Sequence, residues 1–365
     1  MKQIARLDRR EGFSRRACLA GAAAGGLALM AHPALALPVR AGRAAAPLVD
    51  HHIHLGSPTL SDRIAQIDKA DPSAFDHLSR DIFSRPTLSD ALHLLDEAGI
   101  QRAVLLSSAY LFMPGSTFSD ATAADAAGRQ MREENRFAVE AGRASHGRLI
   151  VCFAVNPFAP NANEEFAYWK SNPGVHGLKL HLGSADFHAS NPEQVLKVAA
   201  LFAAAREARL APVVHLRGGG PFPKAEVEVF IDKVVSQAGD LPVQIAHGGG
   251  YGGADPATID SLATFGAAIA QGAPGTKNLV LDLSGIVLPD ADAQALGSTD
   301  AQLKVFVALM RKIGLDRFVM GSDWPAIGRI APYYDLMRRR LPVTDDEWAR
   351  LCSNVAPYLR KPRSA

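Results

Sequence analysis

Histidines and aspartates of types that bind divalent metals are spread over several short apolar segments. The segment VDHHIH at 49–54 places Asp50, His52 and His54 at alternate positions. If this segment is a β-strand, these three side chains point to one face and the intervening residues point to the other. Two imidazoles two residues apart at the end of a strand can bind one divalent metal ion. The spacing also fits a polar strand end without a metal, so at this point it marks His52 and His54 only as candidate ligands.

Three later apolar segments end in residues of the same kind. PVVH ends in His215, VQIAH ends in His247 before three glycines, and FVMGSD ends in Asp323. One histidine at a strand end is more often structural than ligating, but four His and one Asp after apolar segments are hard to assign to packing. A metal with imidazole and carboxylate ligands keeps an open position for water or substrate. The pattern predicts a catalytic metal site.

These residues need a fold that gathers strand ends in one place. From residue 47 onward, short apolar segments alternate with segments of helical periodicity. An open doubly wound sheet is the second possibility, but no glycine-rich phosphate loop opens the first helix. Eight strands, each followed by a helix, predict a (β/α)8 TIM barrel, in which active sites lie at the C-terminal ends of the strands. The expected strands are 47–55, 102–107, 149–155, 177–182, 212–216, 243–247, 279–283 and 317–321.

Two connections are longer than a minimal barrel needs. Residues 56–86 and 108–120 lengthen loops on the C-terminal face, where they either cover the active site or form surface insertions. With 285–299, they determine the shape of the pocket. Residues 344–359 predict a closing helix. Helix boundary signals are Thr87 with Asp90, Gly99, Asn191-Pro192, Asp255-Pro256 and Gly314.

Taken together, the motifs resemble those of the amidohydrolase superfamily. The resemblance rests on the histidines of 49–54, on GLKLH at 177–181, on the strands that end in His215 and His247, and on GSDWP at 321–325. It extends over about residues 48–359. The most similar branch is the amidohydrolase-related group, which contains lactone and ester hydrolases and decarboxylases similar to aminocarboxymuconate-semialdehyde decarboxylase.

The resemblance implies a role for each main residue. His52, His54, His215 and Asp323 would bind one divalent metal, and His247 would orient or deprotonate the metal-bound water. Asp323 could also carry a proton to the leaving group. Zn²⁺ suits three His and one Asp best, with Mn²⁺ or Fe²⁺ as alternatives.

Other polar residues near the strand ends are weaker candidates. Other branches of the superfamily carbamylate the lysine that corresponds to Lys179 and use it to bridge two metals; here we expect one metal, with Lys179 in a supporting ion pair. Arg217 either receives a substrate carboxylate through its planar guanidinium or is a solvated loop residue. The candidates for substrate contact are Arg217, His181 and Trp324, with a satisfied core position as the alternative for His181. The candidates for hydrogen bonding behind the ligands are Lys179, Asp282 and Ser284.

Three functions are compatible with this pattern. The first is hydrolysis of a lactone, ester or amide of a small molecule by metal-activated water. The second is metal-dependent, non-oxidative decarboxylation of an aromatic or unsaturated carboxylic acid. The third is a binding protein without activity, which the complete ligand set disfavours. Evidence for export favours hydrolysis, because decarboxylases of central catabolic acids usually work in the cytoplasm.

That evidence lies in the N-terminus, which has the pattern of a twin-arginine (Tat) signal peptide. Arg15-Arg16 precede an uncharged stretch from 17 to 39 that contains the small-x-small site Ala34-Leu35-Ala36. We expect the Tat translocase to export the chain, cleavage near Ala36, no remaining membrane span, and a periplasmic or secreted protein. Residues 37–365 then form one barrel domain.

Composition narrows the function further. Residues 1–36 account for +4 of the formal charge; the whole chain carries +2, which leaves −2 for the remainder. A nearly neutral chain without a basic block argues against nucleic acid as a partner. Cys152 and Cys352, the two cysteines beyond the signal, are expected to be buried free thiols rather than a disulfide. We therefore expect a small-molecule substrate. A homodimer is compatible with the sequence.

The export prediction can be tested directly. Replacing Arg15 and Arg16 together with lysine should leave the precursor in the cytoplasm, because the twin arginines are the feature that the translocase reads. Cell fractionation measures this, and N-terminal sequencing of the exported wild-type chain locates the cleavage site. An exported protein that still begins at Met1 would contradict cleavage.

Overall fold

The computed structural model describes residues 45–76, 78–220, 222–289 and 298–360. The expected signal peptide at 1–36 and part of the connection at 285–299 lie outside the described residues. None of the described helices combines the length and the apolar composition needed to cross a membrane.

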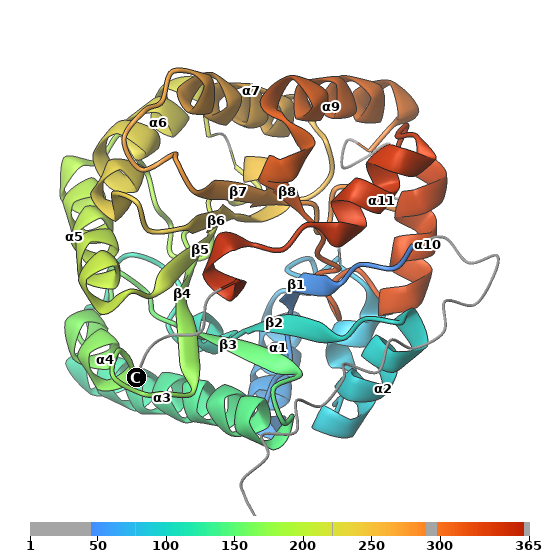
Figure 1. Cartoon of the computed structure of the whole chain (residues 1–365). Helices are drawn as coiled ribbons and strands as arrows, with labels where there is room; N and C mark the ends of the chain where they lie inside the picture. Colours follow the sequence, from blue (N-terminus) through green and yellow to red (C-terminus); the bar gives the residue numbers. More distant parts are fainter. Residues whose placement is uncertain (1–44, 77, 221, 290–297, 361–365) are drawn as a thin grey trace, which may run out of the picture. The chain divides into compact units, whose positions relative to one another are not determined.

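Eight parallel strands form the centre of the fold, in the order β1 to β8 (Figure 1). Main-chain hydrogen bonds continue from β8 back to β1: His51 N donates to Met320 O at 2.8 Å, and Asp323 N donates to His52 O at 2.8 Å. The predicted (β/α)8 barrel is confirmed. Its strands are β1 (Val49–Ile53), β2 (Arg102–Leu106), β3 (Leu149–Ala154), β4 (Val175–His181), β5 (Ala211–His215), β6 (Val243–Ile245), β7 (Leu279–Asp282) and β8 (Phe318–Val319).

Helices surround the barrel on its outside (Figure 1). The α-helices are α1 (Pro58–Ala70), α2 (Leu88–Ala98), α3 (Ala121–Ala144), α4 (Ala162–Trp169), α5 (Pro192–Ala208), α6 (Lys224–Val229), α7 (Pro256–Ala270), α9 (Asp300–Ile313), α10 (Ile330–Arg340) and α11 (Asp345–Ser353). Short helical turns are η1 (Arg80–Phe83), η2 (Ala109–Phe112), η3 (Phe230–Val234), η4 (Val235–Ala238), η5 (Ala246–Gly249), η6 (Leu315–Arg317) and η7 (Pro357–Leu359).

The helix boundaries follow the capping signals in the sequence. Thr87 and Asp90 form a reciprocal capping box at the start of α2, and Gly99 ends this helix in the left-handed region at φ 73°. The side chains of Asn191 and Asp255 accept hydrogen bonds from the first turns of α5 and α7, each followed by proline. These predicted boundaries are confirmed. They could be predicted because the capping hydrogen bonds join residues that are close together in the sequence.

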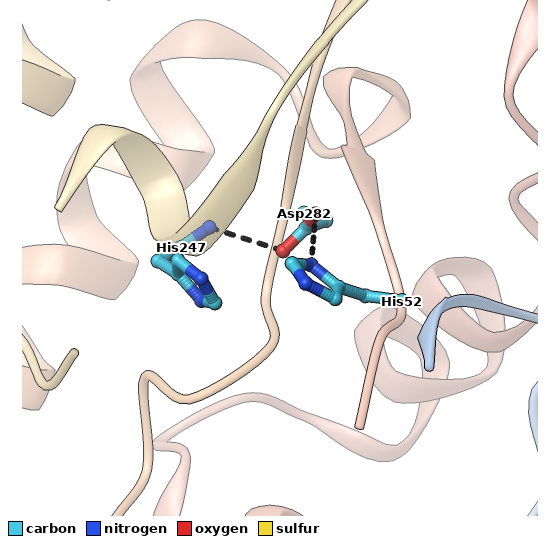
Figure 2. A group of neighbouring side chains, drawn as sticks. All are labelled: His52, His247 and Asp282. Atoms are coloured by element: carbon cyan, nitrogen blue, oxygen red, sulfur yellow. Dashed lines mark hydrogen bonds and ion pairs between the residues drawn. The ribbon is translucent and has the colours of Figure 1, made fainter. Parts of the chain in front are cut away.

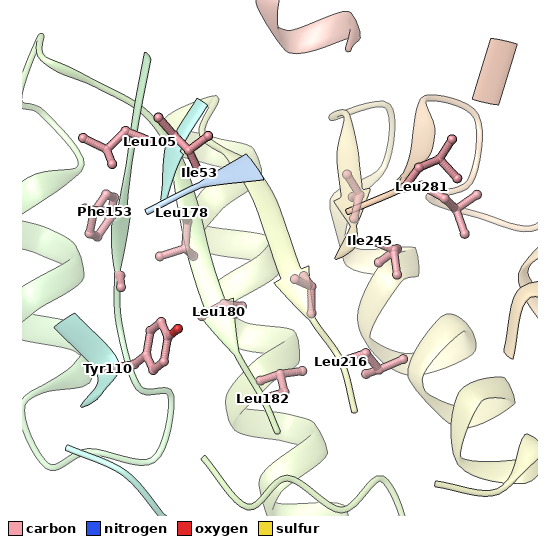
Figure 3. Packing of buried hydrophobic residues seen from close by; sticks show 14 of the residues in the cluster. Ile53, Leu105, Tyr110, Phe153, Leu178, Leu180, Leu182, Leu216, Ile245 and Leu281 are labelled. Carbon is pink, nitrogen blue, oxygen red and sulfur yellow. The ribbon is translucent and has the colours of Figure 1, made fainter. Parts of the chain in front are cut away.

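Apolar side chains on the two faces of the strands form separate cores. Outward residues such as Leu178, Leu180 and Ile245 belong to the large cluster between the barrel and the helices (Figure 3). Inward residues near the N-terminal ends of the strands, such as Val104 and Val213, form a small cluster inside the barrel. Because Leu178 and Leu180 face outward, the alternation along β4 turns Lys179 and His181 to the inward face.

The prediction that Asp50 shares a face with His52 and His54 is wrong. The pairing of β1 with β2 shifts register between Asp50 and Ile53, which breaks the strict alternation of the strand. Asp50 Oδ1 instead accepts hydrogen bonds from the main-chain N–H groups of His52 and Ser322. Asp50 therefore ties β1 to the chain after β8 and is not a metal ligand.

The same irregularity gives His51 a structural role. Its Nδ1 donates to Met320 O at 2.9 Å, and its Nε2 accepts from the main-chain N–H of Ala356 at 3.1 Å. Burial lowers the pKa of His51 to about 4. Both ring nitrogens are used, so His51 links β1 to β8 and to the C-terminal segment.

The closing helix predicted at 344–359 is shorter than expected. α11 ends at Ser353, and η7 follows after a break, because Pro357 cannot continue the hydrogen bonding of a helix. Tyr358 and Leu359 pack against the inner apolar cluster, and the Tyr358 hydroxyl donates to Gln244 Oε1 at 2.6 Å. The segment after α11 therefore closes the N-terminal end of the barrel.

Asn354, at the break, is expected to contribute to stability. Its Nδ2 donates to the buried carbonyls of Leu315 and Phe318, both at 2.8 Å. Asn354→Ala should lower the free energy of unfolding by about 1–3 kcal/mol, because two buried carbonyls lose their partner. Urea denaturation measures the change, and Ser353→Ala at the neighbouring exposed position is the control. A loss no larger than that of Ser353→Ala would contradict this assignment.

Candidate metal centre and active-site pocket

Three of the predicted ligands meet at the C-terminal end of the barrel. His52 Nε2 lies 3.2 Å from His54 Nε2, and both atoms lie 3.3 Å from Asp323 Oδ1. His52 lies on β1, His54 just beyond it, and Asp323 shortly after β8. Because the chain after β8 forms hydrogen bonds with β1, residues that are far apart in the sequence become neighbours.

The hydrogen bonds of the two imidazoles leave their Nε2 atoms free to bind a cation. His52 Nδ1 donates to Asp282 Oδ2 at 3.1 Å, and His54 Nδ1 donates to Leu106 O at 2.8 Å. In a neutral imidazole with the proton on Nδ1, Nε2 carries only a lone pair. Two lone pairs and a carboxylate oxygen that face one another repel unless a cation lies between them. The three residues therefore fit a divalent metal.

His215 and His247 lie beside this group. His247 Nδ1 donates to Ser284 O at 2.8 Å, so His247 Nε2 accepts the hydrogen bond of His215 Nδ1 at 3.0 Å. His215 Nε2 is then a lone pair, and it is buried without a hydrogen-bond partner among the described residues. An unpartnered buried acceptor is costly, which fits the predicted role of His215 as a fourth ligand. His247 holds the ring of His215 in this orientation.

Asp282 is the hydrogen-bond acceptor that organises the site from behind. Figure 2 shows its carboxylate between His52 and His247. Besides His52, it accepts from the main-chain N–H of His247 at 3.0 Å, from Gln244 Nε2 at 2.8 Å and from Ser284 Oγ at 2.5 Å. Both oxygens are occupied by N–H and O–H donors, so Asp282 orients the ligands and does not bind the metal.

Asp282 and Ser284 thus hold the places that the sequence predicted for them. Gln244, which sequence reasoning missed, contributes through its inward position on β6 and also donates to His51 O at 3.0 Å. A polar residue in the middle of the short apolar strand VQI was the available signal.

Two site residues adopt a backbone conformation that side chains disfavour. His247 has φ 54° and Asp323 has φ 58°, both in the left-handed region. The chain leaves β6 before His247, so the predicted strand at 243–247 is two residues too long. Such conformations persist where the surrounding hydrogen bonds require them. Gly321 is needed nearby, because a Cβ there would lie 2.9 Å from His52 Cβ.

Burial sets the protonation of the site. It lowers the pKa of His52 to about 4 and holds the pKa of His215 well below its ordinary value. Burial alone raises the pKa of Asp282, but its interactions with His52 and His247 outweigh burial and leave the pKa below its ordinary range. These pKa shifts favour neutral imidazoles and ionised carboxylates. Those are the protonation states that a metal site requires.

Lys179 lies inside the barrel beneath this site. Its side chain is fully buried, and its Nζ has no hydrogen-bond partner among the described residues. Burial lowers the pKa of Lys179 to about 8, against the opposing effect of Asp323 and Asp282. The positive charge of Lys179 balances the negative charges of these two carboxylates. The predicted supporting ion pair of Lys179 is not formed at hydrogen-bond distance among the described residues.

A pocket opens above the centre, and the ring of His181 forms part of its wall. His52, His54, His215, His247 and Asp323 lie at its base. His181 stacks on His215 with ring centroids 3.9 Å apart, and Tyr110 packs on the other side of His181 at 4.4 Å. Tyr110 and Tyr251 also line the pocket; sequence reasoning missed both because they follow the strand ends at no regular spacing.

Two predicted substrate contacts lie elsewhere. Arg217 Nη2 donates to Asp255 Oδ2 at 2.8 Å, so its guanidinium ties the β5 loop to the start of α7. Trp324 is 3% exposed and belongs to the large core cluster. Neither residue lines the pocket.

Cys152 and Cys352 are buried free thiols, as expected.

The chain belongs to the amidohydrolase family. The family model described as amidohydrolase (Amidohydro_2) matches residues 49–354, which include every metal-site residue discussed above. No curated protein sequence matches the chain.

Solved structures share the fold at low sequence identity. An amidohydrolase from Burkholderia multivorans with bound zinc has 17% identity and a TM-score of 0.53 over 84% of this chain and 96% of that one. A 5-carboxyvanillate decarboxylase from Novosphingobium aromaticivorans, in complex with manganese and 4-hydroxy-3-methoxy-5-nitrobenzoic acid, has 13% and 0.54 over 85% and 94%. A 2,6-dihydroxybenzoate decarboxylase from Rhizobium has 13% and 0.52 over 85% and 96%.

Loss of Asp282 should weaken metal binding without removing any ligand. Asp282→Asn keeps the size of the side chain but cannot accept every N–H that faces it, so the His52 ring loses its fixed orientation. We expect metal affinity to fall by roughly 10–100-fold. Competition with a chromogenic chelator measures the affinity, with Asp260→Asn on α7 as the control. Unchanged affinity in Asp282→Asn would contradict the proposed organisation.

The roles of His54 and His247 can be separated. His54→Ala should abolish tight metal binding, because it removes one of the three atoms that meet at the centre. His247→Ala leaves those three in place, so most metal should be retained while activity falls by roughly 10²-fold. Elemental analysis of both variants decides the matter, with about one metal per chain expected for the wild type. Equal metal loss in both variants would make His247 a ligand.

Proposed function

We propose that the chain is a metal-dependent enzyme that removes carbon dioxide from an aromatic or unsaturated carboxylic acid. The observation that carries the proposal is the contrast inside the pocket. Its base holds the metal-binding residues, whereas no Lys or Arg lies among the described residues that line it. The metal centre is then the part of the pocket that can attract a carboxylate.

Such a pocket favours loss of carbon dioxide on electrostatic grounds. A carboxylate loses hydration when it enters an apolar cavity, and away from the metal centre no Lys or Arg among the described lining residues compensates for that loss. Carbon dioxide is uncharged and apolar, so the same walls do not disfavour the product. The free-energy difference between the bound acid and the product therefore shifts toward decarboxylation.

The chain must also supply a proton. When the bond between the substrate carbon and the carboxylate breaks, the electron pair stays on the substrate carbon, which then takes up a proton. We assign this transfer to His247 and Asp323, each of which would first take up a proton from water, because both lie at the base of the pocket. A bound metal would supply a positive charge that orients the acid and stabilises negative charge.

The comparisons support this reaction over the hydrolysis that export alone would favour. Two of the structural neighbours described above are decarboxylases of hydroxylated aromatic acids, and one of them binds manganese. Another neighbour binds zinc. We propose one divalent metal of this group, with Zn²⁺ or Mn²⁺ as the candidates.

Hydrolysis of a lactone, ester or amide is the second candidate function. The observation in its favour is the pair formed by His215 and His247 next to the metal-binding atoms. His247 Nε2 can accept a proton from water once its hydrogen bond with His215 Nδ1 is broken, while His215 Nε2 remains the atom that would bind the metal. A neutral ester also needs no cation on the pocket walls. We further propose that either reaction takes place in the periplasm or outside the cell, after export.

One experiment distinguishes the two reactions. Metal-loaded protein is incubated in ¹⁸O-labelled water with a panel of hydroxylated benzoic acids, aryl esters and lactones, and products are analysed by mass spectrometry. Decarboxylation predicts loss of carbon dioxide and no ¹⁸O in the remaining organic product. Incorporation of ¹⁸O into a new carboxylate, without release of carbon dioxide, would replace this proposal with hydrolysis.

A further inference from the structure

One wall of the pocket is built by the long connection between β1 and α2. Its apolar side chains face the cavity from α1, from the turn after it and from η1. They belong to the segment 58–86, which is part of the connection 56–86 that the sequence identified as an extension of the C-terminal face. The main members are Leu60, Ile64, Phe75, Leu78 and Ile82.

The charges of this wall are separated from the cavity. The segment contains nine Asp, Glu, Lys and Arg residues, and none of them lines the pocket. Several pair with one another on the outside instead: Arg85 with Asp62, and Arg80 with Asp68 at 3.9 Å. The segment is rich in charged residues, yet only its uncharged side chains line the pocket. This part of the pocket wall therefore carries no charge.

The hydroxyl groups in the wall are also already used. Ser61 Oγ donates to Ser57 O at 3.3 Å, and Ser84 Oγ donates to Asp81 O at 2.5 Å. Their protons are therefore not free to bind an anion in the pocket. Elsewhere in the lining of the pocket, Leu111, Leu288 and Ile327 are apolar as well.

Hydrogen bonds fix the wall in place. Ser57 N, just before α1, donates to the buried Glu134 at 3.1 Å. Ser79 N, before η1, donates to Ala326 O at 2.7 Å, which attaches the wall to the loop that carries Asp323. Arg63 Nε donates to Leu111 O at 3.3 Å. The distance between the apolar wall and the metal centre is thus set by the folded chain.

We infer that the substrate carries one polar reacting group at the metal and an uncharged, apolar part on the opposite side, which the segment 58–86 contacts. This inference rests on the proposed function, because it assumes that the reacting group binds at the metal centre. It names the substrate class: monocarboxylic acids, or their ester counterparts, with an alkyl-, aryl- or ether-type distal group. Substrates with a second charge at that end are excluded.

Binding of two unreactive ligands tests the inference without any turnover. 4-Methylbenzoate and benzene-1,4-dicarboxylate differ only in the distal group, and isothermal titration of metal-loaded protein measures their dissociation constants. The wild type should bind the methyl compound about tenfold more tightly or better, because the second carboxylate would lose its hydration against apolar side chains. Equal or tighter binding of the dicarboxylate, or binding of neither ligand, would overturn the inference.

Two neighbouring substitutions on α1 locate the effect. Ile64 lines the pocket, whereas the adjacent Ala65 is exposed on the outer side. Ile64→Arg should reduce the preference for the methyl compound at least fivefold, and Ala65→Arg should leave it within twofold. Circular dichroism confirms that both variants fold. An equal change in both would mean that general electrostatics, not the wall, sets the preference.

The outcomes remain separable from those of the proposed function. If carbon dioxide is not released but the ligand preference and the Ile64→Arg effect are found, decarboxylation fails and the distal specificity stands. If carbon dioxide is released but the dicarboxylate binds equally well, the specificity inference fails alone.

Discussion

The site depends on one buried carboxylate, Asp282, at the C-terminal end of β7. It accepts hydrogen bonds from residues of β1, β6 and its own loop, and so fixes His52, the backbone of His247 and Ser284 relative to one another. Removing such an ion from water is costly, and the donors on both oxygens offset that cost. The proton on His52 Nδ1 follows from this contact, and with it the lone pair that His52 directs at the metal centre.

Closure of the barrel brings Asp323 to the metal centre. The hydrogen bond from Asp323 N to His52 O joins the two ends of the sheet at the metal centre, so Asp323 depends on the same contact that completes the fold. The left-handed backbone at Asp323 and His247 shows that local preference gives way to this arrangement. Asp323 and the metal-site histidines lie at the base of the pocket, and the long connection after β1 lines one of its walls with mainly apolar side chains.

The barrel and the metal ligands could be predicted because strand ends carry chemistry in this fold. Apolar segments that end in His54, His215 and Asp323 mark both the strands and the site. The register shift in β1 could not be predicted, since it arises from pairing with β2 and from closure against β8. For this reason Asp50 was placed wrongly. The ion pair between Arg217 and Asp255 could not be predicted from the sequence either. Asp255 lies 38 residues from Arg217, and its position before Pro256 is already explained by its role as a helix cap. Tyr110 and Gln244 carry no spacing signal.

We propose that His52, His54 and Asp323, together with His215, form a single metal centre. Anomalous X-ray diffraction from crystals of the metal-loaded protein tests it most directly. We expect one strong anomalous-difference peak per chain, at about 2.0–2.2 Å from His52 Nε2, His54 Nε2 and an Asp323 oxygen. The absence of a peak between these atoms, or a second peak bridged by a modified Lys179, would contradict it.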